Sequence, residues 1–186
     1  MHPEHLALLQ QAPASTHDDD TWARLCCEQA LLALEEGCYA VGALLVDGAG
    51  ELLCSARNRV FTSTYSSAAH AEMQVLDQLE SEHPQVDRRG LTLYVSLEPC
   101  LMCYGRILLA GITRVRYLAR DRDGGFALRH GRLPPAWANL ASGLAVVQAK
   151  ADPYWLLLAE QAISCLQDRQ ALRQRVIQAW SGQQQP

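Results

Sequence analysis

The sequence predicts a protein of the α/β class, in which helices pack against a sheet in layers. Segments with helical and strand-like patterns alternate along the chain, and no internal repeat or long linker divides it. A helix between two apolar strands near the middle of the chain implies a right-handed crossover and a parallel strand pair. The 186 residues, 49% hydrophobic and 19% charged, can bury a core without disulfides. We expect one domain over residues 1–186, with its core at about 20–150 and a C-terminal helix at about 150–183.

The N-terminal part of the chain predicts a helix that follows a short arm. Residues 1–17 contain two prolines and form either a short helix or a loose arm. Three aspartates, residues 18–20, and Thr21 then place acidic and capping residues ahead of an amphipathic stretch. This stretch, Trp22–Glu36, is followed by Gly37, so we expect the first long helix to end there.

A hairpin and a loop come next. Residues 41–46 and 52–56 are apolar and flank the turn sequence Asp47–Gly50, which predicts two antiparallel strands. Residues 57–69 are rich in serine and threonine and form the loop that leads to His70.

The following helix runs from His70 to about Glu82. Met73, Leu76 and Leu79 recur in it at helical spacing. We therefore expect these three side chains to face the core.

A strand, a helix and a second strand form the centre of the prediction. Residues 91–97 alternate apolar and polar side chains after a turn at Gly90, and residues 113–119 are β-branched and aromatic. The helix between them begins near Cys100 and stops at Gly111. Functional groups should gather where the strand ends lead into helix N-termini, the usual ligand position in α/β folds.

The last third of the chain is more irregular. Residues 120–139 contain several glycines and prolines and are expected to be a long loop that could serve as a lid. A short strand over 144–148 and one long helix over 153–180 follow. The tail, residues 181–186, is expected to be disordered.

One histidine, two cysteines and one glutamate carry the chemistry. His70 lies two residues before Glu72, and Pro99 precedes Cys100 and Cys103, which are three residues apart. If Cys100 opens a helix, both sulfurs lie on one face of its first turn and can bind one ion. Three ligands leave the fourth tetrahedral position of zinc to water, as in catalytic sites. We expect His70, Cys100 and Cys103 to hold Zn²⁺ and Glu72 to transfer protons.

Two other interpretations of these residues stay open. A fourth cysteine could close the site and make the zinc structural, which would leave Glu72 without a role. The chain could also be a non-catalytic zinc-binding relative, although such a protein has no chemical reason to keep Glu72. The cysteines outside the pair are most simply buried apolar residues. They are Cys26, Cys27, Cys38, Cys54 and Cys165.

Together, these motifs resemble the signature H-x-E followed by P-C-x-x-C of the zinc-dependent cytidine and nucleotide-base deaminases. The resemblance covers roughly residues 20–120. Within the family, the chain is most similar to the branch of tRNA adenosine, guanine and cytosine deaminases. The segments that carry this similarity are Val41–Val46, Arg57–Arg59 and Leu93–Cys103. It implies a three-layer α/β/α cytidine-deaminase-like fold with a central mixed sheet of about five strands.

The resemblance also implies roles for single residues and a reaction. Asn58 would hydrogen-bond the base or sugar, unless it is an ordinary turn residue after a strand. The backbone N–H of Ala71 would meet a polar group on the ring. The reaction would replace an amino group on the base by a carbonyl and release ammonia. Members of this branch are commonly homodimers, and Trp155–Ala159 could serve such an interface or simply the core.

The expected substrate is a small free base or nucleoside, similar to guanine or cytosine. Binding of nucleic acid depends on basic surfaces, whereas this chain has a formal charge of −4 and a single lysine, Lys150. Residues 104–106 and 119–125 also depart from the pattern of the tRNA enzymes. tRNA adenosine deamination is the alternative. It would need a local arginine patch, for which the candidates are Arg129, Arg132, Arg169, Arg173 and Arg175.

A base pocket needs an aromatic or apolar wall, and four aromatic candidates lie in or after the proposed lid. Each of them is more often a core residue than a part of the pocket. The aromatic candidates are Phe126, Trp137, Tyr154 and Trp155. Asp121 and Asp123 could add an acidic contact to a purine, or could be solvated loop residues.

The sequence also predicts a compartment. No apolar run approaches the roughly 20 residues needed to cross a membrane, and the N-terminus lacks the features of a secretory signal. Seven cysteines at irregular spacings do not resemble a disulfide framework. We therefore expect a cytoplasmic protein without membrane contact.

Overall fold

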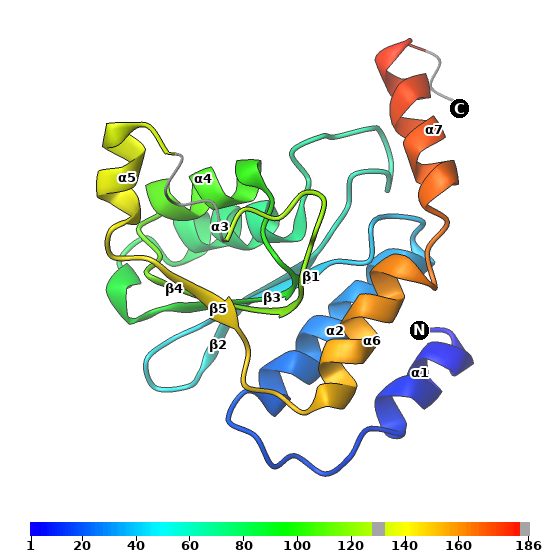
Figure 1. Ribbon diagram of the computed structural model, residues 1–186, viewed down its shortest axis with the longest axis horizontal. Helices are drawn as coiled ribbons and strands as arrows, with labels where there is room; N and C mark the ends of the chain where they lie inside the picture. Colours follow the sequence, from blue (N-terminus) through cyan, green and yellow to red (C-terminus); the bar gives the residue numbers. More distant parts are fainter. Residues whose placement is uncertain (128–132, 183–186) are drawn as a thin grey trace.

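A computed structural model describes residues 1–127 and 133–182, which form a five-stranded mixed sheet with helices on both faces (Figure 1). The strands are β1 (Gly42–Val46), β2 (Leu52–Arg57), β3 (Thr92–Leu97), β4 (Arg114–Ala119) and β5 (Ala145–Gln148). The α-helices are α1 (Pro3–Gln10), α2 (Asp20–Glu35), α3 (Ala71–Glu82), α4 (Leu101–Leu109), α5 (Pro135–Ala141), α6 (Pro153–Ser164) and α7 (Arg169–Trp180). A short 3₁₀ helix, η1 (Arg88–Gly90), precedes β3.

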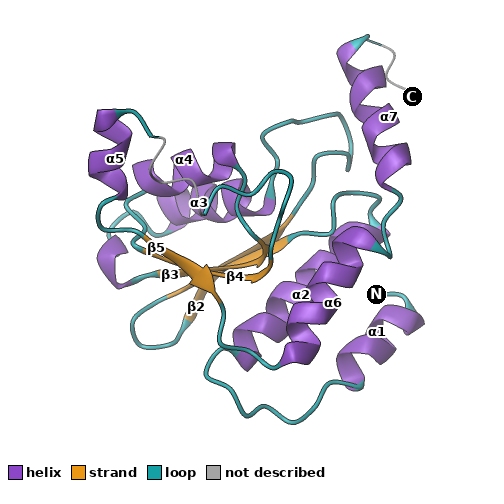
Figure 2. Cartoon of the chain, in the orientation of Figure 1, coloured by secondary structure: helices purple, strands orange, loops and turns teal. Residues whose placement is uncertain are grey.

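The sheet has the strand order β2-β1-β3-β4-β5. β1 pairs antiparallel with both β2 and β3, whereas β3, β4 and β5 run parallel. The helices α2 and α6 lie against one face, and α3 and α4 cover the other (Figure 2). Every residue of β1 is buried because helices cover the sheet on both faces. The expected three-layer α/β/α fold is therefore confirmed.

The elements up to β4 agree with the sequence prediction to within two residues at each end. The predicted hairpin is formed by β1 and β2, and the predicted parallel pair by β3 and β4. Gly37 and Gly111 follow α2 and α4 with positive φ angles of 69° and 76°, the backbone region that favours glycine at helix ends.

Within α3, one predicted core residue lies elsewhere. Leu76 and Leu79 are fully buried as expected, but Met73 is only half-buried and lines a groove on the outer side of the helix layer. Val75 takes its place in the core. Met73 instead shares this groove with residues of the neighbouring helix α4.

The prediction of one long C-terminal helix is wrong, because the chain turns between α6 and α7 (Figure 1). Gln167 in this turn is 8% exposed, and its side chain binds the backbone ahead of β1. Its Oε1 accepts a hydrogen bond from Ala40 N at 3.3 Å, and its Nε2 donates to Cys38 O. Asp168 then begins α7 by accepting a hydrogen bond from Ala171 N at 3.0 Å.

Residues 120–139 also contain more structure than expected. The helix α5 occupies the end of this segment, and residues 120–127 form a loop against the start of α4. The middle of the proposed lid, residues 128–132, lies outside the described residues, as do Arg129 and Arg132 of the proposed arginine patch.

The expected interface segment on α6 belongs mainly to the core. Trp155, Leu158 and Ala159 are each 3% exposed, and Leu157 alone in this run is largely exposed. α6 packs on α2 and β4, so the apolar character of the run is explained by burial inside the protein.

The structure decides between the short helix and the loose arm that were the alternatives for residues 1–17. The N-terminal arm contains a true helix, α1, which packs outside α2. The tail, residues 181–186, was predicted to be disordered, and residues 183–186 of it lie outside the described part of the chain. Among residues 1–127 and 133–182, none of the helices combines the length and apolarity that crossing a membrane requires.

Two buried aspartates at the start of α2 connect distant segments, instead of capping the helix as predicted. Asp19 accepts hydrogen bonds from Tyr94 Oη at 2.8 Å and from Lys150 N at 2.6 Å. Asp20, 2% exposed, accepts three backbone hydrogen bonds at 2.6–2.8 Å. Their donors are the N–H groups of Thr16, His17 and Asp152. The two carboxylates thus fasten α2 to β3 and to the segment that joins β5 to α6.

Replacing Asp20 by asparagine should lower the free energy of unfolding at pH 7 by about 1–3 kcal/mol, because the neutral amide cannot accept all three backbone hydrogen bonds. Burial alone would raise the pKa of Asp20, but the backbone hydrogen bonds outweigh it and hold the pKa below its usual value. The stabilisation by the wild-type carboxylate is therefore present above the unfolded-state pKa and is lost as the pH falls through the lower folded-state pKa.

Urea unfolding of both proteins at pH 7 and in more acidic buffers measures this difference. The exposed neighbour Asp18 provides the matched control, since Asp18→Asn removes the same charge from the surface. A loss of stability that is equal in the two variants would contradict the role of Asp20.

Candidate metal centre and pocket

Three predicted ligands meet where two helices begin. His70 is the residue that precedes α3, and Cys100 is the residue that precedes α4. Cys103 follows in the first turn of α4 and is fully buried. His70 Nδ1 lies 3.8 Å from Cys100 Sγ and 3.5 Å from Cys103 Sγ.

These distances fit tetrahedral zinc. With Zn–N and Zn–S bonds of their usual length, a nitrogen and a sulfur on one tetrahedral ion lie about 3.6 Å apart. The ligand atoms of the three side chains all lie within 4.8 Å of one another. This group does not include any of the other five cysteines, which the structure describes, so the interpretation as a zinc site closed by a fourth cysteine loses its support.

The surroundings favour negative charge on one of the two sulfur atoms, that of Cys100. A hydrogen bond with the Cys103 side chain lowers the pKa of the Cys100 thiol to about 4 against the effect of burial, and His70 acts in the same direction. The same hydrogen bond and burial raise the pKa of Cys103. The N-terminus of α4 adds the positive end of the helix dipole. A thiolate at Cys100 is the form that binds a cation.

Glu72 lies in the first turn of α3, next to this group. Its side chain is 3% exposed, and it lines the same pocket as His70 and Cys100. Burial raises the pKa of the Glu72 carboxyl above its usual range. A carboxyl group with a raised pKa binds and releases protons closer to neutral pH than an exposed glutamate does.

The pocket beside the metal group is a cavity of about 240 Å³. Its described lining comes from the segment before β1, the ends of β2 and β3, the starts of α3 and α4, the loop after β4 and the end of α6. The lining residues are Tyr39, Val41, Asn58, His70, Glu72, Leu97, Glu98, Cys100, Asp121 and Ile163. Its apolar members provide a wall for a flat ring, and its polar members surround the metal group.

Asn58 is held rigidly in this pocket. It is 1% exposed, its N–H donates to Val41 O at 2.9 Å, and its Oδ1 accepts from Val60 N at 3.1 Å. These bonds fix the orientation of the side-chain amide. Ala71, the other predicted contact, is fully buried at the first position of α3, where backbone N–H groups have no acceptor within the helix.

Several pocket residues belong to no motif of the sequence. Glu98 alone among them carries a local signal, because a charged residue at the end of an apolar strand, just before Pro99, is unusual. Tyr39 and Ile163 carry no local signal, since only the folded chain brings them to the site.

The four aromatic candidates lie outside the described lining of this pocket, so the interpretation as pocket residues is not supported. Phe126 packs on Tyr104 with ring centres 5.0 Å apart, and Trp137 lies near Gly105. Tyr154 donates a hydrogen bond to a backbone carbonyl of α1, and Trp155 is in the core.

The two predicted acidic residues differ in position. Asp121 lines the pocket, and its Oδ1 accepts hydrogen bonds from Asp123 N at 3.1 Å and Gly124 N at 2.9 Å. Asp123 is exposed and lies 3.8 Å from Arg169 at the start of α7. Asp121 is thus a part of the pocket, whereas Asp123 is a surface residue.

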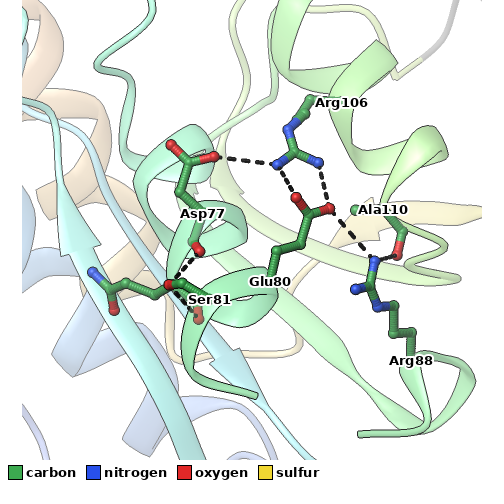
Figure 3. Close-up of polar contacts among 7 residues, drawn as sticks. Asp77, Glu80, Ser81, Arg88, Arg106 and Ala110 are labelled. Carbon is green, nitrogen blue, oxygen red and sulfur yellow. Dashed lines mark hydrogen bonds and ion pairs between the residues drawn. The ribbon is translucent and has the colours of Figure 1, made fainter. Parts of the chain in front are cut away.

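Ion pairs hold together the two helices that carry the ligands (Figure 3). Arg106 of α4 donates to both oxygens of Glu80 on α3, at 2.8 and 2.7 Å, and to Asp77 at 3.2 Å. Arg88 lies 3.5 Å from Glu80 and donates to Ala110 O at 3.0 Å. A paired carboxylate and guanidinium with two parallel hydrogen bonds fix geometry better than a single contact.

The helix α7 supports the loop that leads to His70. Leu172 is buried in a small apolar cluster with Val60, Phe61 and Ala69 of this loop. Arg175 donates to Phe61 O at 3.2 Å and places its guanidinium 4.3 Å from the centre of the Phe61 ring. Arg175 therefore points into the protein and is unsuited to a surface patch for nucleic acid.

Comparison with known proteins identifies a family. Residues 16–119 match the family described as the cytidine and deoxycytidylate deaminase zinc-binding region. A tRNA-specific adenosine deaminase of Bacillus subtilis is 37% identical over 107 residues, which cover 58% of this chain and 65% of that protein. A probable cytosine deaminase of Schizosaccharomyces pombe is 31% identical over 108 residues, 58% of this chain and 64% of that protein. The chain thus spans slightly less than two thirds of these curated relatives.

Solved structures agree in fold. A structure from work on A-to-I editing by tRNA:A34 deaminases at the wobble position is 32% identical, covers 62% of this chain and 89% of that chain, and has a TM-score of 0.56. A guanine deaminase of Bacillus subtilis is 29% identical, and the match covers 55% of this chain and 65% of that chain with a TM-score of 0.50. A guanine deaminase of Nitrosomonas europaea is 20% identical, and the match covers 89% of this chain and 95% of that chain with a TM-score of 0.59. At this identity the similarity shows the fold alone.

Replacing Cys103 by serine should reduce bound zinc from about one ion per chain to a small fraction, because a serine hydroxyl is a poor zinc ligand at neutral pH. Elemental analysis of the dialysed proteins measures the zinc content, and circular dichroism checks that the variant is folded. Cys165→Ser changes an exposed cysteine outside the group and should keep its zinc. Equal zinc in wild type and folded Cys103→Ser would contradict the assignment.

Proposed function

The chain belongs to the cytidine and deoxycytidylate deaminase zinc-binding family, and from this we propose that it deaminates a small nucleobase or nucleoside by hydrolysis and releases ammonia. The observation that carries this proposal is the position of Glu72, a buried carboxyl in the same small pocket as the zinc-binding group. A structural zinc site or a non-catalytic relative has no use for a buried acid at this place.

We assign a role to each residue of the centre. His70, Cys100 and Cys103 hold zinc, which when bound lowers the pKa of water toward neutrality. Glu72 accepts the proton that the attacking water loses and delivers it to a ring nitrogen, which makes the amino-bearing carbon electrophilic. Glu72 then takes the remaining proton from the added hydroxyl group and transfers it to the amino group as the C–N bond breaks, so that ammonia leaves and a carbonyl remains.

The pocket supports a small and uncharged substrate. Its cavity of about 240 Å³ is below the range of about 300–1,000 Å³ that larger ligands occupy. Besides the ligand His70, its charged side chains in the described part are the carboxyl groups of Glu72, Glu98 and Asp121. Carboxylates around the cavity repel a phosphate. Asn58 and the N–H of Ala71 are proposed as further contacts to the ring.

The second candidate is deamination of adenosine in tRNA. The specific observation in its favour is the 37% identity to a tRNA-specific adenosine deaminase, together with the structural similarity to the tRNA:A34 deaminases. The overall charge of −4 and the inward direction of Arg175 give it less support from this chain itself.

We also propose that the protein acts as a homodimer in the cytoplasm. All seven cysteines are unpaired, as a reducing compartment and thiolate ligation require. On the outer side of α4, a groove of about 490 Å³ is lined almost wholly by apolar side chains such as Leu101, Leu109 and Trp137. Leu101 and Leu109 are 60% and 63% exposed, and this surface lies beside the metal centre, where the family resemblance places a second copy.

The proposed activity is tested by ammonia release from a panel of substrates. The zinc-loaded protein is incubated with free bases, nucleosides, nucleotides and an anticodon stem-loop RNA. We expect turnover of a base or nucleoside, and little or none of the corresponding nucleotide, because the acidic pocket repels phosphate. Turnover of the RNA alone would instead establish the second candidate.

The variant Glu72→Gln tests the mechanism on the same panel. It should reduce ammonia release by about 10²–10⁴-fold while zinc content stays at the wild-type level, because glutamine cannot transfer protons. Glu160→Gln on the exposed side of α6 is the matched control and should keep full activity. Wild-type activity in Glu72→Gln would overturn the assigned role.

The homodimer is tested by light scattering coupled to size exclusion. Leu109→Glu should shift the protein from dimer to monomer, because a charge in an apolar interface must be desolvated. Leu157→Glu on α6 changes a similarly exposed leucine, at 55% against 63%, and should remain dimeric. A monomeric wild type, or a dimeric Leu109→Glu, would contradict the proposal.

A further inference from the structure

The pocket contains a buried carboxylate that the proposed mechanism does not use. Glu98 follows β3, lies two residues before Cys100, and is 4% exposed. A buried carboxylate is unfavourable unless hydrogen bonds satisfy it. The partners of Glu98 therefore indicate what its charge does in this fold.

Both oxygens of Glu98 bind one segment, the loop that follows β4. Oε1 accepts a hydrogen bond from Ala127 N at 2.9 Å, and Oε2 accepts one from Asp121 N at 3.3 Å. The Arg120 side chain, which is half-exposed, lies 3.9 Å from Oε2. One side chain thus holds both ends of residues 121–127.

Backbone contacts hold the same loop against the start of α4. Phe126 N donates to Pro99 O at 3.0 Å, and Gly125 forms an isolated β-bridge with Cys100. The loop therefore lies directly against the zinc ligand Cys100.

The approach of the loop to Glu98 depends on a glycine. A Cβ added at Gly125 would lie 2.5 Å from Glu98 Cδ and 2.5 Å from Asp121 O. Neither distance is possible for real atoms, so any side chain at this position would push the loop away from the carboxylate.

The loop itself is a tight turn that contributes a pocket residue. Gly125 N donates to Asp121 O at 3.0 Å, and the side chain of Asp121 binds two further backbone N–H groups of the turn. Asp121 lines the pocket, so the position of this lining depends on the position of the turn.

We propose that Glu98 is a positioning residue that holds residues 121–127 as a wall of the substrate pocket and thereby sets the affinity for the base. It acts through Asp121 and the turn and takes no part in proton transfer. The nature of the bound base rests on the proposed function, whereas the hold on the loop does not.

The variant Glu98→Gln tests this proposal because glutamine keeps the size of the side chain but offers one acceptor oxygen. Its amide nitrogen then faces a backbone N–H. Hydrogen–deuterium exchange of the zinc-loaded protein should show amides of residues 121–127 exchanging about tenfold faster. With the substrate identified in the panel, KM should rise about tenfold while kcat changes by less than about threefold. Zinc content should equal that of wild type.

Gly125→Ala provides a second and independent disturbance of the same contact. It should reproduce faster exchange and a higher KM without changing Glu98 itself. Gly143→Ala is the matched control, since an added Cβ there meets no atom within 4 Å, and it should match wild type.

Unchanged exchange in both variants, faster exchange with an unchanged KM, or loss of zinc in Glu98→Gln would each overturn the proposal. If no substrate of the panel is deaminated, the proposed function fails, and the exchange data still decide whether Glu98 holds the loop.

Discussion

The convergence of two helix N-termini on one point is the constraint around which this structure is arranged. His70 and Cys100 occupy equivalent positions, each with an extended backbone immediately before its helix. Two positive helix ends therefore face the sulfur atoms and the cavity, which favours thiolate and other negative charge there. Such an arrangement requires α3 and α4 to keep fixed positions relative to each other. The hydrogen bonds of Arg106 to Glu80 connect the two helices.

Local signals predicted the elements that need only local information. Gly37 and Gly111 mark helix ends, and the spacing of His70, Cys100 and Cys103 is sufficient to select three side chains whose ligand atoms the structure brings within 4.8 Å of one another. The break between α6 and α7 could not be predicted, because helical periodicity continues through it. Gln167 in this turn is buried against partners that lie about 130 residues earlier in the chain. The pocket lining has the same origin, since contacts from separate elements leave no pattern in a single sequence.

Buried carboxylates serve one structural purpose in three places. Asp19, Asp20 and Glu98 each accept backbone N–H groups from segments that are remote in the sequence. Loops have few regular partners for their backbone donors, and an ionised acceptor binds such donors more strongly than a neutral one. The loops around this sheet are thus held to it by single buried side chains.

The support that α7 gives to the loop before His70 has a consequence for synthesis of the chain. Leu172 and Arg175 lie more than 100 residues after Phe61, so a ribosome synthesises His70, Cys100, Cys103 and all five strands before the helix that steadies the loop exists. During that interval the nascent chain contains the side chains of the candidate metal centre but lacks the contacts of α7 to the loop before His70. Those contacts form only once the last helix is complete.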